Sequence, residues 1–150
     1  MNSKKNKVNS YFWDYEIVPP EIFFNDKIDN ILFISPWQIQ VSKFLRFRYG
    51  VAYCNNYYNG GYYKYRGTRL HDCDIGAKLS LHKRLSALDL VFKYTTAEEV
   101  REDIKKIESR NSSIESVFKR IGICRIEDGV SWIHVDSLSN GTNKIHFFNP

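Results

Sequence analysis

Residues 80–92 read Ser-Leu-His-Lys-Arg-Leu-Ser-Ala-Leu-Asp-Leu-Val-Phe. The run from Leu88 to Phe92 is apolar and has the length of a buried strand, but Asp89 interrupts it. A carboxylate inside a strand core costs free energy unless it is paired or bound to a metal ion. The stretch therefore predicts a buried strand that carries a functional acidic group, with His82 shortly before it.

A second strand is predicted where the sequence reads Val-Ser-Trp-Ile-His-Val-Asp, over residues 130–136. Because side chains alternate along a strand, Ile133 and Val135 should pack on the core. The opposite face should line a cleft, and it carries Trp132, His134 and Asp136.

Together, His82, Asp89 and His134 offer two imidazoles and one carboxylate. Three such ligands leave one coordination position for water, which is the pattern of catalytic zinc sites. Spacing alone leaves ordinary alternatives open: a hydrogen-bonded loop histidine, a capping or salt-bridged carboxylate, and a satisfied strand histidine.

The residues on either side of these two strands show both helix signals and strand periodicity, which together predict an α+β fold. Ser35-Pro36 predicts a helix start and Gly50 its end. Thr96 and Glu99 form a capping box for a second helix, and Ser112 with Glu115 predicts the start of a third. Residues 51–54 read as a short strand. After Gly122 the apolar period becomes two, over residues 123–126, 130–135 and 145–148, which predicts a C-terminal antiparallel meander.

The N-terminal segment divides the chain into two predicted parts. Residues 1–19 are predicted as a polar tail and extended arm, since Pro19 and Pro20 break the apolar stretch from Tyr11 to Phe24. Residues 20–150 are predicted as one domain. No apolar segment follows the N-terminal lysines, so no secretory signal is expected, and no stretch is long enough to span a membrane.

The overall charge and the cysteines narrow the class of protein. The net charge of +5 favours anionic partners, such as nucleic acid, a membrane surface or a cell-wall polymer, without choosing among them. The chain has three cysteines and no paired Cys-x-x-Cys spacing. This argues against both a disulfide framework and a thiolate zinc cluster.

Three ordered motifs resemble those of one enzyme family. Residues 80–89 resemble the SxHxxGxAxD signature of zinc D-alanyl-D-alanine peptidases and the related L-alanyl-D-glutamate endopeptidases. Residues 132–136 resemble that family's later WxHxD-type segment, and Gly67-Thr68-Arg69 resembles its earlier G-Y-R. Residues 55–90 and the ending Phe148-Asn149-Pro150 are most similar to phage-encoded members. The resemblance covers residues 20 to 150.

The resemblance implies a hedgehog/DD-peptidase fold, with an antiparallel sheet and helices packed on one side. It implies zinc bound by His82, Asp89 and His134. Arg69 would hold a substrate carboxylate or carbonyl, for which a planar guanidinium is suited. Trp132 and Ser80 are assigned to the substrate side of the site, Ser80 by shaping the loop.

The sequence departs from the family pattern at two positions. Leu85 stands where the signature has glycine, so the turn between the ligands is open to change. Ser131 stands where many members have a glutamate that acts as general base. Asp136 shares the face of His134 and is the favoured substitute, although it is equally suited to orient a histidine; Glu127 and Asp128 precede the strand.

These features predict a zinc-dependent peptidase that hydrolyses peptidoglycan stem peptides, as a phage endolysin or a virion-associated wall hydrolase. It would act at the cell wall from the virion or from the infected host, with other virion proteins as further partners. The alternative is a catalytically impaired zinc-binding module of the same fold, in the virion or on the wall. A nucleic-acid-binding domain built on the tyrosine-rich loop, residues 57–66, ranks below both.

Overall fold

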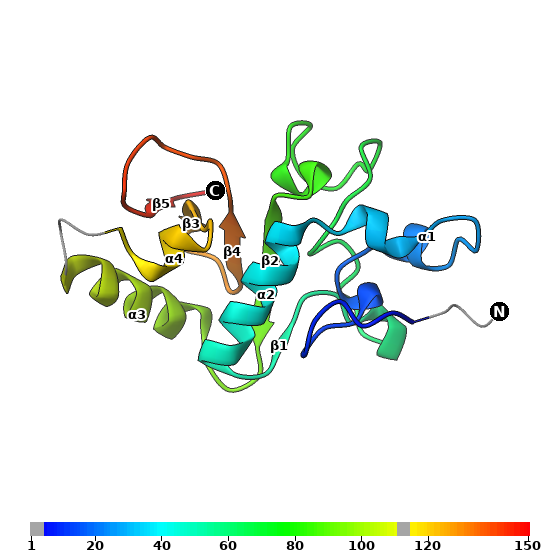
Figure 1. Cartoon of the computed structure of the whole chain (residues 1–150), viewed down its shortest axis with the longest axis horizontal. Helices are drawn as coiled ribbons and strands as arrows, with labels where there is room; N and C mark the ends of the chain where they lie inside the picture. Colours follow the sequence, from blue (N-terminus) through cyan, green and yellow to red (C-terminus); the bar gives the residue numbers. More distant parts are fainter. Residues whose placement is uncertain (1–4, 111–114) are drawn as a thin grey trace.

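The computed structural model describes residues 5–110 and 115–150 and has an α+β fold (Figure 1). In chain order the elements are η1 (Asp14–Glu16), α1 (Pro20–Phe23), η2 (Asn30–Phe33), α2 (Pro36–Tyr49), β1 (Ala52–Tyr53), η3 (Tyr57–Asn59), η4 (Leu81–Arg84), β2 (Ala87–Phe92), α3 (Ala97–Arg110), α4 (Val117–Arg120), β3 (Arg125–Glu127), β4 (Ile133–Asp136) and β5 (His146–Phe148), where η marks a 3-10 turn.

The strands form one sheet in the order β1-β2-β4-β3-β5. β2 and β4 are antiparallel, with Asp89 opposite His134. β3 and β4 are antiparallel as well, with Arg125 opposite Asp136. The prediction of an antiparallel sheet is therefore right for β1 to β4. It is wrong for β5, which runs parallel to β3 and makes the sheet mixed.

The position of β5 in the sheet is set by which strand edges are still unpaired. A meander would set β5 beside β4, but β2 and β3 already pair with both edges of β4. β5 therefore joins the outer edge of β3. Asp136 at the end of β4 and His146 at the start of β5 both pair with Arg125, so residues 137–145 cross one end of β3. From that end β5 runs antiparallel to β4 and therefore parallel to β3.

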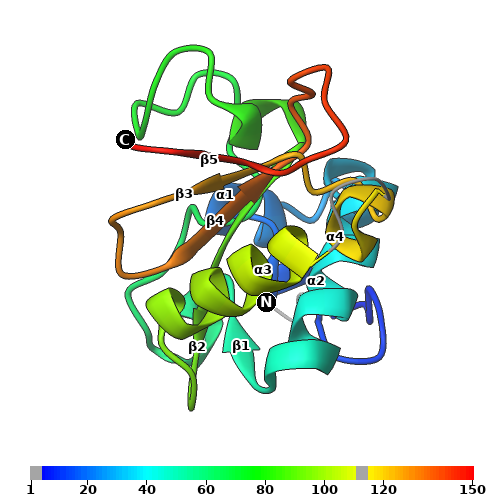
Figure 2. The same cartoon turned by 90° about the vertical axis from the view of Figure 1, so that its left-hand side faces the viewer.

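The two faces of the sheet differ sharply in chemistry. Leu88, Leu90, Ile133 and Val135 are fully buried in the hydrophobic core, as the alternation of β4 predicts. α2 packs against β2 and α3 against β4, and Figure 2 shows α2, α3 and α4 gathered on one side of β4. The other face carries charged and polar side chains, so it is the face that holds the candidate site.

The helix starts follow local capping. Ser35 caps the start of α2 and Gly50 ends that helix with φ 90°, both as expected, and Gln38 completes a capping box with Ser35. Thr96 accepts a hydrogen bond from the backbone N–H of Glu99, which confirms the second predicted cap.

The start of the third predicted helix differs from the sequence prediction. Ser112 lies outside the described residues. The described helix α4 begins at Val117, and its cap is Ser116, whose side chain accepts a hydrogen bond from the backbone N–H of Lys119. Glu115 precedes this cap, so it is not a capping-box residue of α4.

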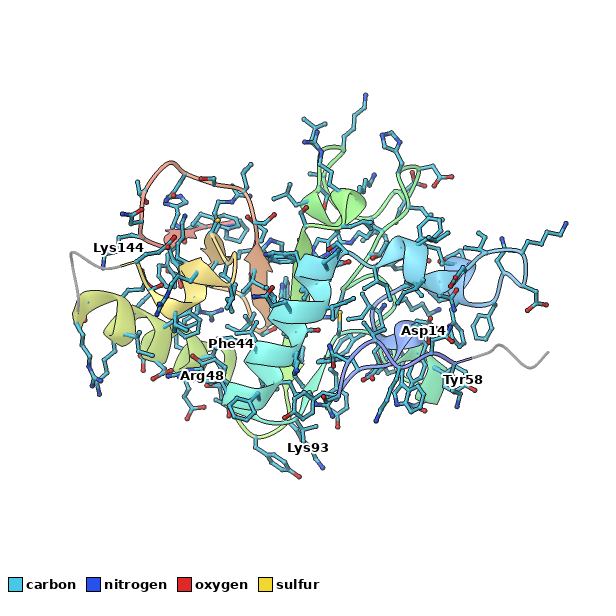
Figure 3. All side chains as sticks on the ribbon, viewed as in Figure 1. Asp14, Phe44, Arg48, Tyr58, Lys93 and Lys144 are labelled. Carbon is cyan, nitrogen blue, oxygen red and sulfur yellow. The ribbon has the colours of Figure 1, made fainter. Side chains whose placement is uncertain are left out.

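The prediction that residues 11–24 form an extended arm is wrong. Phe12, Ile17 and Val18 are fully buried in the same core as the sheet. Pro20 begins α1, where its fixed φ suits a first helical position. The carboxylate of Asp14, labelled in Figure 3, accepts hydrogen bonds from the Asn30 side chain at 3.0 Å and from the Tyr15 backbone N–H at 2.8 Å. Buried polar contacts thus fix this segment to the fold.

A tight turn joins His82 to β2. Ser80 caps η4 by accepting a hydrogen bond from the backbone N–H of His82, and Leu85 ends η4 in the left-handed conformation, with φ 57° and ψ 29°. Among the described residues, Leu85 is the only non-glycine with positive φ. Leucine thus adopts here the left-handed conformation that glycine favours. The hydroxyl of Ser35 donates to the Leu85 carbonyl at 2.6 Å.

We expect Leu85→Gly to leave the free energy of unfolding within about 1 kcal/mol of wild type, because relief of left-handed strain offsets the added flexibility of the unfolded chain. Leu85→Val should be less stable than Leu85→Gly by about 2 kcal/mol, since a β-branched residue tolerates positive φ poorly. Chemical denaturation of the two variants measures this difference. Equal stability of the two variants would show that the turn relaxes.

Candidate metal centre

His82, Asp89 and His134 meet on the polar face of the sheet, as the sequence predicts. The Nε2 atom of His82 lies 3.3 Å from Oδ1 of Asp89 and 3.4 Å from Nδ1 of His134. Nδ1 of His134 lies 2.7 Å from the same Asp89 oxygen. One atom from each side chain therefore converges on a single point.

The spacing of these three atoms fits a small tetrahedral cation. Zinc bonds of about 2.0–2.2 Å place neighbouring ligand atoms roughly 3.3 Å apart. Two of the three separations have this length. The third, between His134 and Asp89, is shorter and has the length of a hydrogen bond, so a proton on Nδ1 holds the pair together when no metal is bound.

Each ligand side chain is fixed by its own element. Asp89 and His134 lie directly opposite each other on β2 and β4. His82 lies on η4, and its Nδ1 donates to the carbonyl of Gly67 at 2.7 Å, which leaves Nε2 directed at the cluster. Gly67 itself packs tightly against the Ile17 carbonyl, where a Cβ atom would clash. The ligand geometry thus depends on the N-terminal segment.

The second histidine is held in the same way by a carboxylate. Nε2 of His134 lies 3.3 Å from Oδ2 of Asp136. When a metal takes one nitrogen of an imidazole, the other N–H normally donates to a carboxylate or a backbone carbonyl. The Asp136 carboxylate and the Gly67 carbonyl supply these two acceptors, so both rings are oriented for metal binding.

The charges of the cluster shift its ionisation. Burial alone lowers the pKa of His134, but hydrogen bonds and charge from Asp136 and Asp89 outweigh it and raise the pKa to about 9. Burial alone raises the pKa of Asp89, but hydrogen bonds from His134 and His82 hold that pKa below its usual range. Without a metal, the cluster is therefore a protonated His134 between two carboxylates.

Asp136 is fully buried and bound to Arg125. The guanidinium of Arg125 donates to Oδ1 at 3.0 Å and to Oδ2 at 2.8 Å, and the backbone N–H of Leu138 donates to Oδ1 at 2.9 Å. Burial opposes ionisation, but hydrogen bonds from His134 and Arg125 outweigh it and lower the pKa of Asp136. These contacts favour an orienting role; its role as proton carrier stays a prediction.

Arg69 extends to the cluster from the loop before η4. Its Nη2 atom lies 3.4 Å from Oδ2 of Asp89, the oxygen that faces away from the histidines. Its Nε donates to the Tyr65 carbonyl at 2.6 Å, which fixes the guanidinium in place. The structure thus places this predicted substrate-binding residue beside a predicted metal ligand. Ser80 makes its described contact with the backbone of the ligand turn.

Two hollows flank the cluster. The first has a volume of about 250 Å³ and is lined by Trp132, Asp89, Arg69 and Arg66 among others. The Arg66 guanidinium lies 4.0 Å from the ring centre of Tyr63 and 5.1 Å from that of Trp132. The second has a volume of about 450 Å³ and is lined by His134 and Asp136, with apolar walls from Leu79, Leu138 and Phe148.

The sequence analysis did not predict two parts of the site. Arg125 belongs to no recognisable motif, although the alternation of side chains along β3 places it on the polar face. The contact between His82 and the Gly67 backbone carbonyl cannot be recognised from the sequence, because every residue has a carbonyl. Ser131 is exposed and makes no side-chain hydrogen bond with the described residues.

No protein-family model, curated protein or solved structure matches this chain. None of the described helices combines the length and the apolar character that a membrane crossing requires.

We expect the cluster to hold one metal ion per chain, and zinc is the probe for testing this. His82→Ala should weaken zinc affinity by more than 100-fold, because loss of an orienting partner such as Asp136, tested as Asp136→Asn, already weakens it about 10–100-fold. His146→Ala should leave it unchanged, since His146 is exposed on β5 and outside the cluster. Competition with a chromophoric chelator measures all three variants, and circular dichroism checks their folding. Equal affinity in the His82 and His146 variants would exclude this site.

Zinc binding should release protons. Below about pH 9 the metal-free His134 is protonated, so a metal must displace that proton, and affinity should fall by roughly tenfold for each pH unit lost. Above this pH the dependence should flatten. Calorimetric titrations in buffers of different ionisation enthalpy count the protons, and Asp136→Asn should release fewer. A binding heat that is independent of the buffer would contradict the protonated cluster.

Proposed function

We propose that this chain is a zinc-dependent peptidase that hydrolyses peptidoglycan stem peptides. The observation that carries the proposal is the convergence of His82, Asp89 and His134, with the Arg69 guanidinium 3.4 Å from Asp89. Two histidines and one carboxylate form a ligand set that leaves a position open, as catalytic zinc requires. The family resemblance of the three motifs agrees with this set, and it supports a hedgehog/DD-peptidase fold as part of the proposal.

The two hollows support a peptide substrate with both acidic and small apolar groups. Arg69 and Arg66 give the first hollow a cationic, aromatic lining. Leu79, Leu138 and Phe148 give the second an apolar one. Stem peptides carry both free carboxylates and alanyl side chains. The carboxylate would bind at Arg69 and the alanyl side chain in the apolar hollow, which sets the peptide bond across the cluster.

The residues of the site then have separate tasks. A zinc ion bound there would polarise the scissile carbonyl and lower the pKa of water to about 7. Arg69 would anchor the substrate by a charge-assisted hydrogen bond, which is stronger than a neutral one. Asp136 and Gly67 would keep the two imidazoles oriented, and Trp132 would form a wall of the substrate groove.

The motifs and the net charge also bear on where the chain acts. The motifs are most similar to those of phage-encoded members, so we infer that the chain acts at the bacterial cell wall, as an endolysin or as a virion component alongside other virion proteins. The net charge of +5 suits an anionic wall.

A second candidate function is a zinc-binding module of the same fold that has lost catalysis. The exposed Ser131 favours it, because a hydroxyl cannot take the place of the usual glutamate as general base. This candidate predicts zinc binding and attachment to the cell wall without release of peptide ends.

The zinc-loaded chain should release new amino and carboxyl termini from purified peptidoglycan, read by mass spectrometry, and chelation should abolish this until zinc is restored. Arg69→Ala should lower kcat/KM by about 10–100-fold, the loss expected for a charged hydrogen bond. Lys106→Ala, which removes an exposed charge on α3, should change it less than twofold. Wall binding with bound zinc and no cleavage would support the second candidate instead.

A further inference from the structure

Glu127 lies beside the candidate metal centre. The β3–β4 register pairs Arg125 with Asp136 and Ile126 with Val135. One residue further, the same register sets Glu127 opposite His134. Alternation directs Glu127 to the polar face, and Glu127 and His134 line the same hollow. Directly opposed side chains on antiparallel strands have Cβ atoms about 4.5–5.5 Å apart.

Glu127 is half-buried, and its carboxylate has no polar partner among the described residues. It makes no hydrogen bond or ion pair with residues 5–110 or 115–150. The next residue, Asp128, differs in this respect, because it binds Lys105 at 2.9 Å and Arg101 at 3.4 Å. Phe148 pairs with Glu127 across β3 and β5, and its ring centre lies 6.0 Å from that of His134. The carboxylate therefore lies in a walled hollow without a partner.

Three carboxylates line the two hollows that flank the cluster: Asp89, Asp136 and Glu127. Asp89 is the proposed metal ligand. Asp136 is fully buried and engaged by Arg125 and His134. Glu127 alone of the three is free to approach a substrate, and its two methylene groups allow its carboxylate to swing toward the cluster.

We propose that Glu127 is the proton-transferring residue of this site, an inference that rests on the proposed peptidase function. It takes one proton from the water molecule as the water oxygen bonds to the scissile carbonyl carbon. It gives that proton to the amide nitrogen as the carbon–nitrogen bond breaks, which yields an amine and a carboxylic acid. The acid then loses its proton to solvent. Glu127 thus performs from β3 the role that Ser131, two residues before β4, cannot perform.

The test compares Glu127→Gln, Glu127→Asp and the control Glu102→Gln, which alters an exposed glutamate on α3. Glu127→Gln should lower kcat by roughly 10²–10⁴-fold with KM within threefold of wild type, because proton transfer acts in the transition state. Glu127→Asp should recover part of the loss. Zinc affinity and the visible spectrum of the cobalt-substituted protein should stay unchanged in all three, since none removes a ligand.

The outcomes separate this inference from the proposed function. If wild type cleaves the wall and Glu127→Gln keeps its kcat within threefold, the inference is wrong and the peptidase stands. If Glu127→Gln loses zinc or changes the cobalt spectrum, its role is structural and the inference is also wrong. If zinc-loaded wild type cleaves nothing, both fail. Loss of kcat in Asp136→Asn alone, with zinc retained, would assign proton transfer to Asp136.

Discussion

The pairing of Asp89 with His134 across β2 and β4 is the contact on which the rest of the site depends. It is a backbone register as well as a side-chain contact, because a one-residue slip of either strand would turn that strand's member of the pair into the apolar core. Leu88, Leu90, Ile133 and Val135 prevent that slip, since their burial on the opposite face holds the register. Hydrophobic packing on one face thus fixes the polar chemistry on the other.

Around this pair, acidic and basic groups alternate across the sheet. Arg69 lies against Asp89, His134 lies between Asp89 and Asp136, and Arg125 closes the series. Each buried charge has an opposite charge within contact distance, which is the condition for keeping it out of water. Such a series is costly to desolvate and rigid once formed. It contributes more to the position of the side chains than to the stability of the fold.

The sequence was most informative where one residue type has one physical explanation. An aspartate inside an apolar strand and two histidines in recognisable motifs predicted the three residues that the structure brings together, and Ser-Pro and glycine marked the ends of α2. It was least informative where the outcome depends on distant partners. The parallel β5, the Gly67 carbonyl and the pairing of Asp136 with Arg125 follow from sheet order and loop closure, which no local pattern encodes. Pro19 and Pro20 indicated a break, whereas Pro20 begins a helix whose neighbours enter the core.

The separation of the ligands along the chain has a consequence for biogenesis. Asp89 and His134 are 45 residues apart, and β4 is paired on both edges only when β3 has also formed. A nascent chain that has completed β2 holds His82 and Asp89 without their third partner, so under the proposed function it would bind zinc weakly. Tight metal capture would therefore follow only once the chain between β2 and β4 has folded and brought the two strands together. The metal content of newly made protein thus reports whether the last third of the chain has reached its native place.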